Sequence, residues 1–232
     1  MKTIGLLGGM SWESTVPYYQ TLNRIVNREL GGVHSARILM VSVDFQPIEE
    51  LQHQDRWDTL GEMLGADARV LEEAGADFLV LCTNTMHLVA PAIEKAISVP
   101  LLHIADATAA RIREQGLERV GLLGTRFTME EDFYRGRLEE DHGLRVLVPG
   151  RADREIVHRV IYDELVLGKI LDTSRGEYQR VVQELTDQGA EGVILGCTEI
   201  GLLLKPGDAQ VPLFDTAVIH AEEAARWALK GP

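Results

Sequence analysis

Cysteine is scarce in this chain, which has only two cysteines in 232 residues. So few cysteines exclude a disulfide-stapled scaffold and favour a reducing compartment, so we expect a cytoplasmic protein. No run of about 18 apolar residues occurs, and this excludes a membrane-spanning helix. The apolar run near the N-terminus stops after Leu7 and is too short for an export signal.

Basic residues are also few, with 23 Lys and Arg against 36 Asp and Glu and a net charge of −13. An acidic chain without a basic stripe lacks the clustered cations that phosphate contacts need, so we expect no nucleic-acid partner. The apolar share of 45% and the charged share of 25% are those of an ordinary globular protein. This length allows one large α/β domain or two small ones.

The sequence contains an internal repeat. Three pairs of segments match in the same order at nearly one offset: IGLLGG from Ile4 with VGLLGT from Val120, GADFLVLCTN from Gly75 with GAEGVILGCTE from Gly189, and VPLL from Val99 with VPLF from Val211. Each match alone is weak, because apolar strands followed by glycine are common. Together they indicate that the chain holds two copies of one structural unit.

Each copy has the pattern of alternating strands and helices. Apolar, β-branched stretches predict strands at 3–8, 37–43, 78–82 and near 99 in the first copy, and at 119–124, 145–148, 193–197 and near 211 in the second. A spacing near 3.6 predicts helices through Leu60, Leu64, Leu71 and Ala74, and through Tyr178, Val181, Val182 and Leu185. The first helix is expected to start through Ser14 and Thr15, with Pro17 just inside it.

This pattern predicts an α/β fold of two pseudo-symmetric domains, each a four-stranded, mostly parallel sheet flanked by helices. We expect the first domain to comprise residues 1–104 with 214–232, and the second 105–213. The last helix, 216–230, is expected to pack back on the first domain. A pseudo-twofold axis would leave a cleft between the domains, and we expect the active site there.

Both cysteines, Cys82 and Cys197, lie at the predicted carboxyl ends of strands, where open parallel sheets bind ligands. Polar residues follow each of them and lead into a helical stretch. A helix N-terminus lowers the pKa of a nearby thiol, and its free N–H groups bind carboxylates. One short segment can therefore hold an acid group and present a base beside it.

A lone cysteine on an apolar strand is more often a small buried hydrophobe than a catalytic group. The repeat changes this balance, because the two cysteines occupy equivalent positions in the two copies. A twofold axis would place them on opposite sides of a bound carbon atom. This arrangement suits racemisation, in which a base removes a proton from one face while an acid returns one to the other.

The segments IGLLGGMSWEST, CTNTMH and GCTEIGLLL closely resemble the aspartate/glutamate racemase family, which works without pyridoxal phosphate. Within it, the chain most resembles the bacterial broad-specificity amino-acid racemases. The resemblance implies Cys82 and Cys197 as paired acid and base, a homodimer, an amino-acid substrate, no metal and no organic cofactor. It also implies that the substrate site is lined by Met10, Thr83, Asn84, Thr85, Thr125, Thr198 and Glu199. Gln52 is expected to reach this site from the loop after the second strand.

One departure bears on specificity. Aspartate-specific members hold the side-chain carboxylate with basic residues, whereas the segment DFQPIEELQ has none and Val166 stands where such members carry lysine. Loss of those cations removes charge-assisted hydrogen bonds to an acidic side chain. We therefore expect broad specificity, covering aspartate, glutamate or neutral and polar amino acids.

Other functions remain open. A related cysteine-dependent isomerase or decarboxylase is the alternative among enzymes, although the decarboxylases of this superfamily use one cysteine. A non-catalytic amino-acid-binding protein is the alternative of another class. The GLLGGM turn lacks the spacing of a dinucleotide site, and its glycines are expected to let the backbone approach a small substrate. His87 and His103 lack zinc-ligand spacing, and His220 with Glu223 is expected to be a solvated or interdomain pair.

Overall fold

Each half of the chain forms its own four-stranded parallel sheet in the computed structural model, which describes residues 1–230. The first sheet has the order β2-β1-β3-β4, and its strands are β1 (Ile4–Gly8), β2 (Ile38–Ser42), β3 (Phe78–Leu81) and β4 (Leu101–Leu102). The second has the order β6-β5-β7-β8, and its strands are β5 (Arg119–Gly124), β6 (Arg145–Leu147), β7 (Gly192–Gly196) and β8 (Leu213–Asp215). The predicted fold class is confirmed, and all the strand pairs described are parallel.

The chain divides into two structural units, one of Met1–His103 with the segment from His220, and one of Ile104–Ile219. The helices of the first unit are α1 (Trp12–Leu30), α2 (Phe45–His53), α3 (Trp57–Glu73), the 3-10 helix η1 (Thr85–Val89), α4 (Ala90–Ala96) and most of α11 (Thr216–Leu229). The helices of the second unit are α5 (Ile104–Glu114), α6 (Arg126–Glu130), α7 (Asp132–Gly136), the π-helix η2 (Arg137–Asp141), α8 (Arg151–Asp163), the 3-10 helix η3 (Leu165–Leu167), α9 (Asp172–Asp187) and α10 (Ile200–Leu203).

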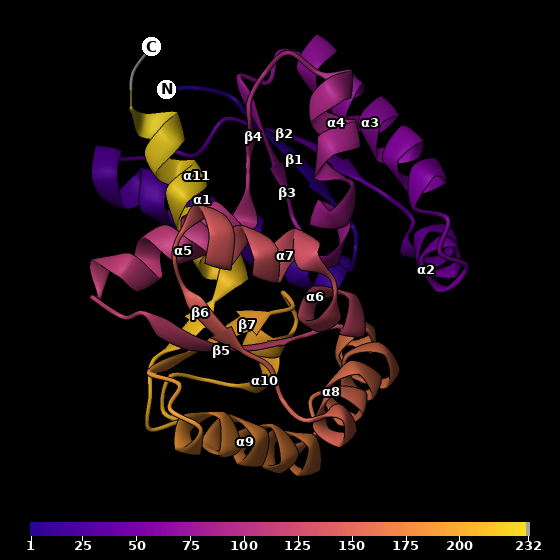
Figure 1. Cartoon of the computed structure of the whole chain (residues 1–232). Helices are drawn as coiled ribbons and strands as arrows, with labels where there is room; N and C mark the ends of the chain where they lie inside the picture. Colours follow the sequence, from indigo (N-terminus) through magenta and orange to yellow (C-terminus); the bar gives the residue numbers. More distant parts are fainter. Residues whose placement is uncertain (231–232) are drawn as a thin grey trace. The chain divides into compact units, whose positions relative to one another are not determined.

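Helices cover both faces of the first sheet (Figure 1). Successive strand residues point to opposite faces, so Leu79 packs into a cluster with Leu64 of α3 and Ile93 of α4. Phe78 points the other way and meets Trp227 of α11, with ring centroids 5.4 Å apart. The sheet therefore has two buried faces, which explains why its strands are continuously apolar.

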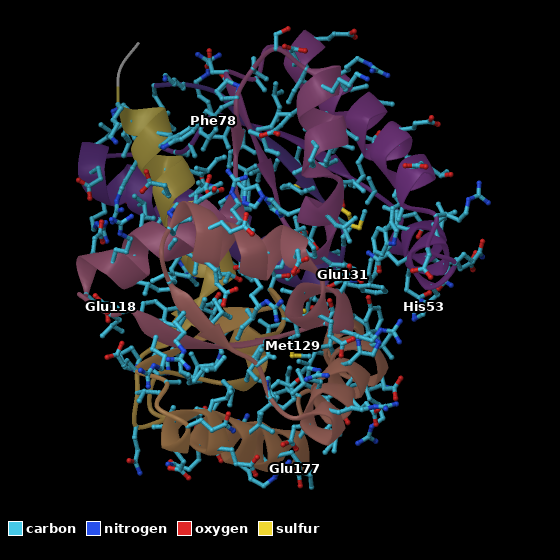
Figure 2. All side chains as sticks on the ribbon, viewed as in Figure 1. His53, Phe78, Glu118, Met129, Glu131 and Glu177 are labelled. Carbon is cyan, nitrogen blue, oxygen red and sulfur yellow. The ribbon has the colours of Figure 1, made fainter. Side chains whose placement is uncertain are left out.

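The second sheet is built in the same way. Its residues Leu123 and Leu195 pack with the helices α8 and α9, where the predicted apolar face of Tyr178, Val181, Val182 and Leu185 is buried. Leu122 and Ile194 pack on the other face with α5 and α7. Figure 2 shows that Glu177 extends outward from α9, whereas Met129 lies among buried side chains.

The two helices that follow the fourth strands are exchanged between the units. Helix α5 follows β4 of the first sheet, yet Ile104 and Ile112 pack with Val120 of the second sheet. Helix α11 follows β8 of the second sheet, yet from His220 onward it belongs to the first unit. In its last turn, the Ala228 carbonyl accepts a hydrogen bond from the Lys2 N–H at 2.9 Å. Each sheet therefore has one face covered by a helix that the chain supplies from the other repeat.

The predicted start of the first helix was wrong. Helix α1 begins at Trp12 with Ser11 as its N-cap, so Pro17 is the sixth helical residue and not the first. Thr15 does not cap the helix, because its hydroxyl donates to the Ser11 carbonyl at 2.8 Å and accepts from the Gly9 N–H at 2.9 Å. Sequence signals for a cap mark the right residue types, but tertiary bonds to the preceding turn decide which of them starts the helix.

The glycine turn after β1 is shaped by the protein itself. Gly9 has φ +95°, and a Cβ there would lie 2.4 Å from the Val43 carbonyl oxygen and 2.6 Å from its nitrogen. Thus the close approach that requires glycine at this position is to the chain that follows β2, and the expectation of a substrate approach is not needed to explain it.

None of the helices within residues 1–230 combines the length and apolar character that a membrane crossing requires.

Replacement of Gly9 by alanine should therefore cost more stability than the same change at Gly31. Both glycines have positive φ, at +95° and +74°, but a Cβ at Gly31 meets no atom within 4 Å. We expect Gly31→Ala to lose about 1 kcal/mol, the cost of a left-handed backbone, and Gly9→Ala to lose about 2 kcal/mol or more because backbone must also move. Urea unfolding measures both values, and equal losses would contradict the steric argument.

Candidate active site

The site-forming residues of the first unit follow two neighbouring strands. Leu7 of β1 pairs with Leu81 of β3, so the turn after β1 and the turn after β3 emerge side by side. Cys82 is the first residue beyond β3, and its N–H continues the ladder by donating to the Leu7 carbonyl at 2.9 Å. The predicted residue Met10 leaves the same edge of the sheet and is buried with Leu7 in one cluster.

The second unit repeats this arrangement with other side chains. Gly124 of β5 pairs with Gly196 of β7, and Thr125 and Cys197 are the next residues on these strands. The Thr125 hydroxyl oxygen accepts the Thr128 N–H at 3.3 Å and caps α6. Cys197 and Thr125 therefore meet at the carboxyl edge of their sheet, as Cys82 and the glycine turn do in theirs.

The thiol of Cys82 is fully buried and has a backbone partner. Its Sγ lies 3.7 Å from the Val80 carbonyl oxygen, to which it can donate a weak hydrogen bond. Burial raises the pKa of this thiol far above its usual range, because the thiolate would lose its hydration. A carbonyl oxygen cannot take up the proton, so nothing in this contact generates the thiolate.

The thiol of Cys197 has a carboxylate partner instead. Its Sγ donates to Glu199 Oε2 at 3.0 Å, and the Thr198 hydroxyl donates to the same oxygen at 3.0 Å. Burial raises the pKa of Cys197 most, and the negative charge and hydrogen bond of the Glu199 side chain raise it further. The Glu199 backbone N–H opposes this by favouring the thiolate. Burial and the charge of Cys197 also raise the pKa of Tyr178.

The expectation that helix N-termini depress both thiol pKa values was wrong. Only the single N–H contact at Cys197 acts in that direction, and α10 after it has four residues while η1 is a 3-10 helix. Such short helices carry little of the macrodipole that a longer helix directs at its N-terminus. Desolvation of a charge is the larger effect at a buried sulfur, so the protonated thiol is favoured at both positions.

The raised thiol pKa values make the fold less stable at alkaline pH. Below the unfolded pKa of about 8.5 each thiol is protonated in both states, but above it only the unfolded chain loses the proton. We expect the free energy of unfolding to fall by about 0.7 kcal/mol per pH unit for each cysteine at pH 8.5, and by about 1.3 kcal/mol per pH unit at pH 10. Urea unfolding in reducing buffer measures this. Cys82→Ala should show a shallower decline, and a slope equal to the wild-type slope would contradict the assignment to Cys82.

The other predicted residues are all buried at these strand ends: Met10, Thr83, Asn84, Thr85, Thr125, Thr198 and Glu199. Gln52 is also buried, but it belongs to helix α2 and not to a loop, which corrects the expectation. Its amide donates to the Met86 sulfur at 2.9 Å, and Met86 directly follows the predicted residue Thr85. The structure thus brings Gln52 to the turn that carries Cys82.

Buried histidines near this turn were not predicted to take part in it. His87 donates its Nδ1–H to the Thr83 carbonyl at 2.7 Å. His220 is fully buried, with Nδ1 3.0 Å from the Tyr18 hydroxyl and Nε2 2.8 Å from the Leu102 carbonyl, so it is not a solvated residue. Glu223 pairs with Arg226 instead. Within residues 1–230, no three His, Cys, Asp or Glu side chains gather as a metal site would need.

The fold is that of solved structures of Asp/Glu racemases and their homologues. The crystal structure of an assigned Asp/Glu racemase from Yersinia pestis superposes with a TM-score of 0.92 at 56% identity, covering 99% of this chain and 100% of that one. The structure of an aspartate racemase homologue from Pyrococcus horikoshii OT3 gives 0.82 at 36% identity, with 98% and 99% covered. The protein is therefore an isomerase that acts on amino acids.

The family follows from the sequence match. The family model for Asp/Glu/Hydantoin racemase matches residues 7–224, so the chain belongs to this family. The broad specificity amino-acid racemase RacX from Bacillus subtilis (strain 168) is 24% identical over 232 residues, covering 94% of this chain and 95% of that protein. The resemblance predicted from the cysteine motifs is confirmed.

Proposed function

We propose that this protein interconverts the L and D forms of amino acids by moving the α-proton between Cys82 and Cys197, without an organic cofactor. The observation that carries the proposal is the equivalence of the two thiols. Each is the first residue after the third strand of its sheet, and each of these strands pairs with the first strand. A reaction whose two directions are mirror images requires two equivalent groups, one for each face of the carbon.

In this mechanism, one cysteine acts as a thiolate and takes the proton from Cα, and the electron pair of the C–H bond passes to the carbanion. The opposite cysteine, as a thiol, donates its proton to the other face and becomes the thiolate. The product is the other enantiomer, and the enzyme is ready for the reverse reaction. The mechanism requires both sulfur atoms to reach one Cα from opposite sides. Because both are buried, substrate entry requires part of the protein to move aside.

The two halves differ in how a thiolate can arise. Glu199 accepts the thiol proton of Cys197 across 3.0 Å, so transfer of that proton needs no water. We assign Glu199 as the group that converts Cys197 into a base. Cys82 has a carbonyl neighbour, so its thiolate forms without help from a carboxylate and more slowly than that of Cys197.

Hydroxyl and amide groups are expected to hold the substrate. Thr83, Asn84 and Thr85 follow Cys82, and Thr125 and Thr198 lie at the corresponding edge of the second sheet. Donors directed at the carboxylate stabilise the negative charge that develops when Cα loses its proton, and a buried site strengthens each such bond. Charge stabilisation by these groups replaces the electron sink that an organic cofactor would supply.

Broad specificity forms part of the proposal. Val166 is partly buried against the apolar cluster of the second unit, and α2 with its N-cap Asp44 contains neither lysine nor arginine. Arg126 follows Thr125 and lines a cavity of about 450 Å³. In that cavity Arg151 pairs with Glu155 and Arg154 pairs with Glu130. Since Val166 and α2 supply no cation, we expect an acidic substrate side chain not to be required. The B. subtilis racemase of broad specificity, similar over nearly its whole length, supports this range.

We also propose a homodimer located in the cytoplasm. The family resemblance supports the dimer, and the scarcity of cysteine, with both thiols free in the structure, agrees with a reducing compartment.

Proton NMR in D2O with single L-amino acids, read together with chiral chromatography, tests the function. We expect the α-proton signal to disappear while the D form accumulates, with aspartate, glutamate and at least one neutral amino acid among the substrates. Turnover of aspartate and glutamate alone would contradict broad specificity. Binding without loss of the α-proton from any amino acid would identify a binding protein and overturn the proposal.

The cysteine variants serve as controls for the mechanism in the same assay. Cys82→Ser and Cys197→Ser should both fold, because the serine side chain is only slightly smaller than that of cysteine. Neither variant should racemise its substrate. Each should still exchange the α-proton of one enantiomer, since one base remains. Near-normal racemisation by either variant would rule out the two-base assignment.

Glu199→Gln should reduce kcat/KM by about 10²-fold, because a general base typically contributes at least that factor. The factor must be the same from both enantiomers, since the equilibrium constant between them is 1. Circular dichroism of the substrate follows both directions. The matched control is Glu191→Gln, which precedes the same strand at its other end and bonds the N–H groups of Glu118 and Arg119. A Glu199 variant as active as this control would exclude the assigned role.

A further inference from the structure

The turn that carries Cys82 is held at two points. The Cys82 N–H donates to the Leu7 carbonyl at 2.9 Å, which fixes the turn to β1. The Thr83 carbonyl accepts the Nδ1–H of His87 at 2.7 Å, and the His87 N–H donates to the Asn84 carbonyl at 3.0 Å. The imidazole thus closes a loop around the three residues that follow β3. The peptide that links Cys82 to Thr83 lies between these two anchors.

The His87 ring is itself held in place by buried aromatic neighbours. The ring of His103 lies edge-on to it with centroids 4.4 Å apart, and the ring of His220 lies 6.0 Å away. His220 is bonded at both nitrogens, because its Nε2–H donates to Leu102 and its Nδ1 faces the Tyr18 hydroxyl. A side chain that is locked by such neighbours can hold a main-chain group within a fraction of an ångström.

Packing alone does not account for an imidazole at this position. His87 is 1% exposed, and burying a polar ring costs free energy unless it is hydrogen-bonded. Leucine would fill similar space at no such cost. The imidazole adds a hydrogen-bond donor that reaches the Thr83 carbonyl. Without that donor, the carbonyl at this strand end would lose the hydrogen bond that a buried polar group needs.

The equivalent turn of the second repeat is built differently. The Cys197 carbonyl accepts the Ile200 N–H at 3.0 Å, and the Glu199 carboxylate contacts the sulfur directly. Glu199 therefore contacts the thiol of Cys197 itself, whereas His87 contacts the backbone of the turn that carries Cys82.

We propose that His87 is a positioning residue for Cys82. Its Nδ1–H bond to the Thr83 carbonyl holds the Cys82 thiol at the angle needed for proton transfer. This inference rests on the proposed function, because it assumes that Cys82 transfers a proton. A misplacement of about 1 Å can cost about 10²-fold in rate. The effect should fall mainly on kcat, because the bond fixes the peptide next to Cys82, whereas the groups expected to hold the substrate come from both sheets.

Three substitutions separate the hydrogen bond from the packing. In His87→Asn the amide nitrogen takes the place of Nδ1, so the donor is kept; His87→Gln moves it one bond further, and His87→Leu removes it. We expect His87→Leu and His87→Gln to lower kcat about 10²-fold with KM within threefold, and His87→Asn to recover at least tenfold of that loss. The control His34→Leu changes an exposed histidine of the same unit and should leave kcat unchanged.

A second readout assigns the effect to Cys82. In a Cys197→Ser background only Cys82 can exchange an α-proton with D2O, and adding His87→Leu should slow this exchange. In a Cys82→Ser background exchange depends on Cys197, and the same addition should leave its rate within threefold. If His87→Leu does not fold, the comparison of His87→Asn with His87→Gln decides the question in the same two backgrounds.

Equal kcat for the Asn and Gln variants, or equal slowing in both cysteine backgrounds, would overturn the role of His87. Either result would leave the two-cysteine racemase in place, provided that wild type racemises and each cysteine variant exchanges one enantiomer. Absence of racemisation by wild type would overturn the proposed function itself, and with it this inference.

Discussion

The parallel pairing of β3 with β1, and of β7 with β5, is the constraint on which the rest of the site depends. Parallel pairing brings the carboxyl ends of adjacent strands to one edge, so the residue after each strand meets the residue after its neighbour. Cys82 and Cys197 use the same place in the two sheets. Everything that differs between the halves, from the glycine turn to the Thr125 cap, is added around this shared geometry.

Burial of the thiols sets the chemistry that this geometry can perform. A buried sulfur is a poor thiolate at rest, because the charge has lost its water, and it is a strong base once formed for the same reason. The carboxylate of Glu199 lies beside Cys197 and is the one group that we propose to take up a thiol proton. In the proposed mechanism, proton transfer across the substrate would then supply the second thiolate. One carboxylate would serve both cysteines, since each turnover would exchange their protonation states.

The sequence predicted the strands well because a strand covered on both faces is continuously apolar and ends where polar residues begin. The strand predicted at 193–197 is found at Gly192–Gly196, and the equivalence of the cysteines needed only the repeat. Properties that depend on distant neighbours were not accessible in this way. The pKa of Cys82 depends on how completely the fold covers it, and the bonds of His220 come from Tyr18 and Leu102, both more than 100 residues away. Gln52 was expected in a loop after the second strand, but the chain there forms α2, which Asp44 caps.

The exchange of α5 and α11 has a consequence for the origin of the fold. A single repeat ends with a fourth strand and a helix, but that helix covers the sheet of the other repeat. A one-copy ancestor would therefore have left one face of its sheet bare as a monomer and would have buried it only by trading C-terminal helices with a second copy. Fusion of two such chains converts the traded helices into α5 and α11 of one polypeptide. Once fused, each cysteine no longer needed to match the other, and the neighbours at positions 87 and 199 were free to diverge.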